Sequence, residues 1–177
     1  MIHNYFQLLG IEATFDLDNA LLLANHRKLQ QSIHPDRFAA SSHAEKLAAV
    51  TQMAQINEAF QILKNPVTRA EYLLQLSGWD KPGDEQTIKS LPLLMEQMAL
   101  REELEEIETA DNSQQLLDVF CGNIDQMTQQ QLQQLSTEFQ QKLSADTIYL
   151  SITRLKFLTK LKSEVIRLDE KLEELDD

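Results

Sequence analysis

The sequence predicts an all-α fold, because its composition, its few turn-forming residues and its apolar periodicity agree. Glu, Gln, Leu, Lys and Ala, which lose little on entering a helix, dominate the 177 residues. Only four glycines and four prolines occur, too few for a turn-rich all-β protein. Apolar residues recur every three or four positions, which places them on one face of a helix. With 42% hydrophobic residues, the chain can form one ordinary domain or two small ones.

The first part of the chain, residues 1–76, is expected to form four helices. Residues 4–9 form one or two helical turns that Gly10 closes, and Asp16 or Asp18 offers a cap for a second helix. The inward face of the second helix consists of Leu22, His26, Leu29 and Ile33. Pro35 ends this helix, because the residue before a proline is pushed out of the helical region.

Two further helices complete this part. The third begins near Ser41 or Ser42, and its apolar face consists of Ala49, Met53, Ile56, Phe60 and Leu63. The fourth runs from about Thr68 to Leu76. Asn65 can cap it, with Pro66 at the first position, where a missing N–H has no consequence.

Residues 77–90 are polar and contain both glycine and proline, so we place a linker between two domains there. Residues 91–177 are then expected to form a three-helix bundle, the simplest packing for three amphipathic helices with short connections. The predicted helices are Pro92–Thr109, Ser113–Leu143 and Asp146–Leu175. Residues 1–76 carry a net charge of −1, and residues 77–177 carry −11.

The acidic balance argues against nucleic acid as a partner, since phosphates would repel the chain, and against an anionic membrane surface. No apolar stretch approaches the length that a membrane span needs, and the N-terminus does not resemble a signal peptide. The single cysteine, Cys121, permits no disulfide within the chain, which suits a reducing compartment. We therefore expect a cytoplasmic protein.

The most specific motif is His34-Pro35-Asp36, between two amphipathic helices. It is accompanied, in order, by Tyr5-Phe6-Gln7-Leu8-Leu9-Gly10, Arg27-Lys28-Leu29, Ile56-Asn57-Glu58-Ala59-Phe60, Asn65-Pro66, Arg69 and Tyr72. Over residues 4–72 these motifs resemble the J-domain, the module by which J-proteins engage heat-shock chaperone ATPases. The resemblance implies that the chaperone is contacted by His34, Pro35 and Asp36 and by a basic face of Arg27, Lys28 and Arg37. Ile33 stands where J-domains often carry an aromatic residue, and an aliphatic side chain can fill the same core position.

The rest of the chain is similar to HscB, the co-chaperone family of iron–sulfur cluster assembly, in its bacterial form. The similarity rests on residues 94–104 (LMEQMALREEL), Leu155-Lys156-Phe157-Leu158 and Arg69-Ala70-Glu71-Tyr72-Leu73-Leu74. It implies a co-chaperone that stimulates an HscA- or DnaK-class ATPase and delivers to it an IscU-type scaffold carrying a nascent cluster. This family usually has an acidic residue where the chain has Ala99, so the chain departs there from the family's polar contacts.

Helical phase predicts a client-binding surface on the helix that begins near Pro92. With Leu93 as origin, Leu100, Leu104 and Ile107 fall within roughly 40° and form the core face. The far side carries an apolar cluster with acidic residues beside it, which is typical of a protein-binding site. These residues are Leu94, Met95, Met98, Glu102 and Glu105. In the alternative, the bundle is packed on all sides and its apolar residues here are core.

Phe157 is expected to join this surface. It lies opposite the stripe Ile148, Ile152, Leu155 and Ile166, and the resemblance to the scaffold-binding family favours its exposure. A second stripe, of Leu150, Leu161 and Leu168, would instead bury it.

Two other functions are compatible with parts of the sequence. One is a J-domain co-chaperone for a different client protein. The other is an enzyme that uses His34 and Asp36 as acid and base, but the sequence offers it no pocket motif. There is no glycine-rich phosphate loop, no converging set of metal ligands and no triad partner for Cys121. We therefore expect no enzymatic activity, no catalytic residue, no cofactor and no metal.

Overall fold

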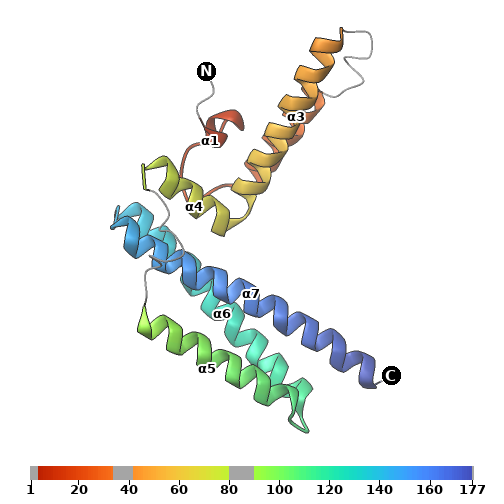
Figure 1. The fold of residues 1–177 in the computed structure, drawn as a ribbon, viewed down its shortest axis with the longest axis vertical. Coiled ribbons are helices and arrows are strands. Elements are labelled where there is room, and N and C mark those ends of the chain that lie inside the picture. The colour runs from red at the N-terminus through yellow and green to blue at the C-terminus, as the bar shows by residue number, and fades with distance from the viewer. Residues whose placement is uncertain (1–3, 34–41, 80–89, 177) are drawn as a thin grey trace. The chain divides into compact units, whose positions relative to one another are not determined.

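The structure is a computed structural model that describes residues 4–33, 42–79 and 90–176 (Figure 1). These ranges contain seven helices and no strand, so the prediction of an all-α fold is confirmed. The helices are α1 (Tyr5–Leu8), α2 (Asn19–Ser32), α3 (His43–Lys64), α4 (Pro66–Leu76), α5 (Leu91–Glu108), α6 (Ser113–Gln140) and α7 (Ala145–Asp176). The chain divides into two compact units, Met1–Trp79 and Asp80–Asp177, within the stretch where we expected the linker.

The helix ends lie where the capping residues predicted them. Asp18 caps α2 by accepting hydrogen bonds from the backbone N–H groups of Ala20 and Leu21, at 2.8 and 3.1 Å. Asn65 caps α4 in the same way, with Pro66 at the first helical position. Gly10, which follows α1, has a φ of +63°, a left-handed conformation that favours glycine.

In the N-terminal unit, α2 and α3 pack as a helical hairpin, flanked by the short helices α1 and α4 (Figure 1). The buried residues of its core come from α1 and its C-cap, both ends of α2 and the second half of α3. They are Phe6, Leu9, Leu22, Ile33, Ile56, Ala59, Phe60 and Leu63. Ile33 is buried, as expected of an aliphatic residue at the position where J-domains often have an aromatic one.

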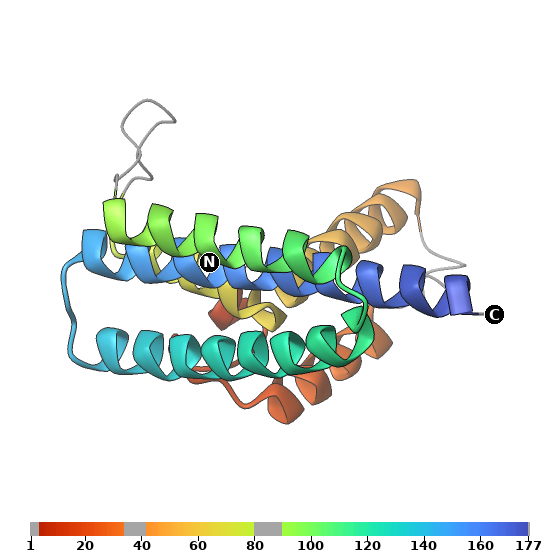
Figure 2. The same cartoon turned by 90° about the horizontal axis from the view of Figure 1, so that it is seen from below.

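The C-terminal unit is an antiparallel three-helix bundle, as predicted (Figure 2). Helices α6 and α7 pack along most of their length, and α5 lies against both. The hydrogen bond from Gln114 Nε2 to Asp169 Oδ1 joins the start of α6 to the end of α7. The bond from Ser151 Oγ to Glu138 Oε1 joins the opposite ends of the same two helices, which fixes their antiparallel direction.

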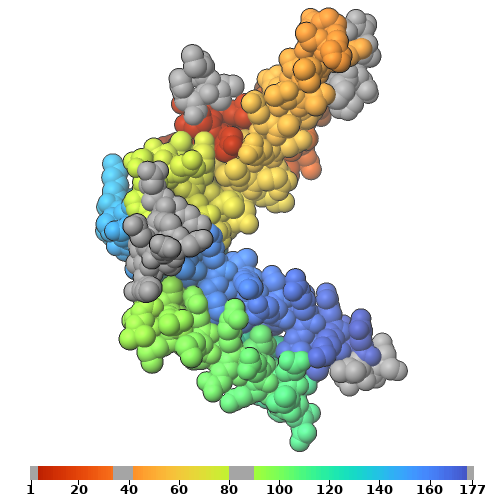
Figure 3. All heavy atoms as spheres, in the orientation of Figure 1, coloured from red at the N-terminus to blue at the C-terminus, as the bar shows by residue number. Residues whose placement is uncertain are grey.

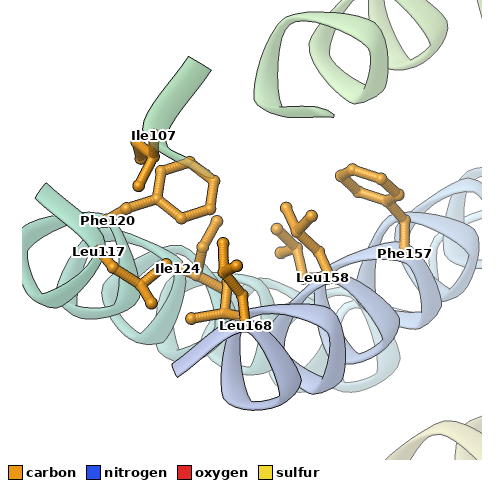
Figure 4. Close-up of a cluster of buried hydrophobic side chains, with 9 residues drawn as sticks. Ile107, Leu117, Phe120, Ile124, Phe157, Leu158 and Leu168 are labelled. Atoms are coloured by element: carbon orange, nitrogen blue, oxygen red, sulfur yellow. The ribbon is translucent and has the colours of Figure 1, made fainter. Parts of the chain in front are cut away.

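The three helices share one apolar core, which Figure 4 shows in close-up. Its buried residues are Ile107 of α5, three residues of α6 and five of α7, namely Leu117, Phe120, Ile124, Phe157, Leu158, Leu161, Val165 and Leu168. No helix of the described part of the chain is long and apolar enough to cross a membrane.

Candidate protein-docking surfaces

The motif expected to contact a chaperone, His34-Pro35-Asp36 with Arg37, lies outside the described residues, but both flanking helix ends are described. At Ile33, which ends α2, the backbone N–H bonds to the carbonyl of Leu29 at 3.2 Å. At the start of α3, Ser42 Oγ accepts from the Glu45 N–H, and Glu45 Oε2 accepts from the Ser42 N–H at 2.8 Å. The Ser42 hydroxyl and the Ser42 N–H both donate to Glu45 Oε2, and these two bonds hold the pKa of Glu45 below its ordinary value. Both helix ends are therefore closed by groups outside the motif.

Helix α2 presents its basic residues to solvent and its histidine to the core. His26 is buried, and its ring stacks on Phe60 with 4.0 Å between ring centroids. Its Nε2 donates to Asn57 Oδ1 at 3.0 Å. Arg27 and Lys28 are exposed. The prediction that His26 packs inward is confirmed.

The first half of α5 carries an exposed apolar cluster, which we call the client patch: Leu94, Met95 and Met98. Their exposed fractions are 53%, 63% and 63%, so the alternative that they form part of the core is wrong. The predicted core face is confirmed, since Ile107 is buried and Leu100 and Leu104 pack against the core. Methionine suits a docking surface because its side chain is flexible and polarizable.

Acidic residues border the client patch. Glu102 and Glu105 are exposed on the following turns of α5, as predicted, and so is Ala99. In the space-filling view α5, in green, forms part of the surface of the C-terminal unit (Figure 3). An apolar centre with a charged rim is the composition of a protein–protein contact.

The expected exposure of Phe157 is wrong. Only 8% of this residue is exposed, and it belongs to the apolar core of the bundle. Figure 4 shows its ring on the same side of α7 as Leu158. The stripe of Leu161 and Leu168 faces the core. Most of the other stripe is buried as well, since only Ile166 among its four residues is exposed, at 46%. Phe157 is therefore part of the bundle core and does not extend the client patch.

Sequence reasoning missed two contacts that join α5 to α7. The guanidinium carbon of Arg101 lies 5.9 Å from the centroid of the Phe157 ring. Arg154 binds both carboxylate oxygens of Glu96, with its Nε at 2.8 Å and its Nη2 at 2.7 Å. Opposite charges on different helices are visible in a sequence, but their pairing depends on how the helices pack.

Among the described residues, no group of three or more His, Cys, Asp or Glu side chains could hold a metal ion. Cys121 is a free cysteine, partly buried against the bundle core. The features that stand out are two separate surfaces, a basic one on α2 and an apolar one on α5.

Comparison with known proteins agrees with this division. Residues 4–72 match the DnaJ domain, and residues 90–166 match the HscB C-terminal oligomerisation domain. A "Co-chaperone protein HscB homolog" from Vibrio atlanticus is 42% identical over 172 residues, with 96% of this chain and 98% of the relative covered. A homolog of the same name from Vibrio vulnificus is equally similar.

Two solved structures have the same fold. Chaperone HscB from Vibrio cholerae is 40% identical, with a TM-score of 0.85 over 96% of this chain and 99% of that one. Human co-chaperone protein HscB is 22% identical, with a TM-score of 0.80 over 99% of this chain and 84% of that one. The two domain matches in order, the 42% identity over almost the whole chain and the shared fold lead to one conclusion: the chain belongs to the HscB family of J-domain co-chaperones of iron–sulfur cluster assembly.

Proposed function

We propose that this chain stimulates ATP hydrolysis by an HscA- or DnaK-class chaperone and delivers to it an IscU-type scaffold that carries a nascent iron–sulfur cluster. The observation that carries the proposal is the client patch, an exposed apolar cluster in a bundle whose apolar core is already formed by other residues. Because a solvated apolar cluster is unfavourable in the free protein, its presence favours a partner that covers it. The lone cysteine suits work in the reducing cytoplasm.

The two units have different roles in this proposal. The J-domain, residues 1–76, docks on the chaperone through the His34-Pro35-Asp36 motif and the basic residues of α2, with Arg37 added. Within the motif, Asp36 can accept two N–H bonds from an arginine of the chaperone. The bundle, residues 91–177, binds the scaffold, and residues 77–90 link the two.

The chemistry takes place in the partner, and the chain itself is not an enzyme. A co-chaperone can raise the ATPase rate only if it binds the hydrolysis-competent state of the chaperone more tightly than the resting state. Holding the scaffold on the same chain also raises the local concentration of client at the chaperone. The metal cluster is cargo of the scaffold in this reaction.

The test is a steady-state ATPase assay with the cognate chaperone, the purified chain and an IscU-type scaffold. The chain alone should hydrolyse no ATP, the chain should raise the chaperone's rate, and chain and scaffold together should raise it further. Scaffold binding to the chain is measured by titration calorimetry. An unchanged chaperone rate would contradict the first role, and absence of scaffold binding would point to a J-domain co-chaperone for a different client.

The basic residues on α2 lead to a second expectation: salt should weaken docking on the chaperone. Arg27 and Lys28 are exposed, and exposed charges at the rim of an interface act mainly on the association rate. Their attraction is screened over about 8 Å at physiological ionic strength. Stopped-flow association rates should therefore fall with rising salt, and Arg27→Gln should lower the rate several-fold at low salt.

The matched control for this expectation is Lys64→Gln. It removes the same charge from an exposed position at the far end of α3 and should leave the association rate near that of the unsubstituted chain. Equal rates for the two variants, or a rate that does not depend on salt, would show that these α2 charges do not guide docking.

A further inference from the structure

Helix α5, which carries the client patch, is anchored unequally along its length. Ile107, in its last turn, is the only buried residue of the helix. Leu93 in its first half and Leu100 near its middle are only partly buried. Hydrophobic packing therefore holds the end of α5 more firmly than the half that carries the client patch.

A single arginine, Arg154 of α7, binds residues of both α5 and α6 and so links the first half of α5 to the other two helices. Arg154 forms a two-pronged ion pair with Glu96 of α5, with N–O distances of 2.8 and 2.7 Å. Its third nitrogen, Nη1, donates to Gln131 Oε1 of α6 at 2.6 Å. The hydrogen bonds to Glu96, together with the negative charge of that carboxylate, raise the pKa of Arg154 above its ordinary value, although burial opposes this. The side chains of Arg154 and Glu96 are 26% and 28% exposed, so solvent screens the pair only in part.

Gln131 holds the guanidinium of Arg154 from a buried position on α6. It is completely buried, and its side-chain carbonyl is directed at the guanidinium of Arg154. Its Nε2 has no hydrogen-bond partner among the described residues. The bond from the charged guanidinium to the Gln131 carbonyl is charge-assisted, and such bonds are stronger than those between neutral groups.

Glu96 lies on the side of α5 that faces away from the client patch. At 100° per residue, Leu94 and Met98 lie roughly 160° around the helix from Glu96, and Met95 lies roughly 100° away. Pulling Glu96 toward α7 therefore turns these three side chains outward. The patch residues also lie within two positions of Glu96 in the sequence, so the pair acts on the turn that carries them.

We infer that the ion pair of Glu96 and Arg154, seated on Gln131, positions the client patch for docking. This inference rests on the proposed function, because it assumes that the patch binds the scaffold. The pair holds the first half of α5 in the orientation that the partner meets, so less ordering is needed at binding. Glu96 and Arg154 are positioning residues, which act on the scaffold through the helix.

The experiment compares Arg154→Gln and Glu96→Gln with the unsubstituted full-length chain. Each variant should bind an IscU-type scaffold about tenfold more weakly in titration calorimetry, since the patch must then be ordered at binding. Amide hydrogen exchange should become faster in residues 94–100 and stay unchanged in α6 and α7. Arg154→Lys, which keeps the charge but not the two-pronged geometry, should recover part of the affinity.

The matched control is Glu108→Gln at the other end of α5. Glu108 Oε1 lies 2.7 Å from Lys171 Nζ of α7, so this variant also removes an ion pair between the same two helices. Its affinity for the scaffold should stay within about twofold of the unsubstituted chain, because surface ion pairs contribute little.

Three results would overturn the inference. Full affinity in Arg154→Gln, with affinity lost when the patch residues are truncated, would remove the positioning role and leave the proposed function standing. Faster exchange throughout α6 and α7 would mean that the substitution loosens the whole bundle. Full affinity after truncation of the patch itself would remove both the positioning role and the assignment of the patch.

Discussion

Replacing His34 by glutamine is expected to abolish stimulation of the chaperone's ATPase, while helical content and melting temperature stay unchanged. The motif is the part of the J-domain through which we propose that the chaperone is engaged. Folding should not depend on it, because Ile33 closes α2 and the pair of Ser42 and Glu45 closes the start of α3. The measurements are a steady-state ATPase assay, far-ultraviolet circular dichroism and a thermal melt.

His43→Gln is the matched control for this prediction. It makes the same chemical change nine positions further on, at the exposed first residue of α3. This variant should stimulate the chaperone as fully as the unsubstituted chain does. Stimulation that persists in His34→Gln, or that is lost equally in both variants, would mean that His34 is not the contact.

The helices could be predicted from local chemistry because single capping residues mark where several of them begin. Asp18, Ser42 and Asn65 each accept a backbone N–H at the start of a helix, and each was among the candidate capping residues in the sequence. His26 could be placed inward because its helical phase coincides with apolar neighbours. On α5 the same argument placed both the core face and the client patch, since this outer helix buries only one side.

The argument failed for Phe157 because α7 packs against two helices of the bundle. Its buried residues, from Ile152 and Leu155 to Phe157 and Leu158, cover an arc of roughly 220°, which a single stripe does not describe. The spacing of apolar residues along one helix does not show where a second helix packs against it. The sequence contained two stripes for this helix, and the structure buries most residues of both. For the same reason, helical periodicity cannot predict which side chains of different helices meet, such as Glu96 and Arg154.

Truncating the client patch is expected to remove scaffold binding without unfolding the bundle. The triple variant Leu94→Ala, Met95→Ala and Met98→Ala deletes side chains that are more than half exposed, so it leaves no cavity. Surface substitutions of this kind usually change the free energy of unfolding by less than about 0.5 kcal/mol each. Residues that dominate an interface contribute about 2 kcal/mol or more each, so the affinity should fall at least a hundredfold. Calorimetric titration with the scaffold and a thermal melt measure the two quantities.

Two comparisons make this prediction specific to the patch. Leu116→Ala with Val119→Ala truncates exposed apolar residues on α6, 38% and 61% exposed, and should leave both affinity and melting temperature nearly unchanged. Phe157→Ala should instead lower the free energy of unfolding by about 3–5 kcal/mol, because it empties part of the core. If the α6 variant binds as weakly as the patch variant, exposed apolar surface in general attracts the scaffold. If the patch variant melts as early as Phe157→Ala, its residues support the bundle, and the docking role assigned to them is wrong.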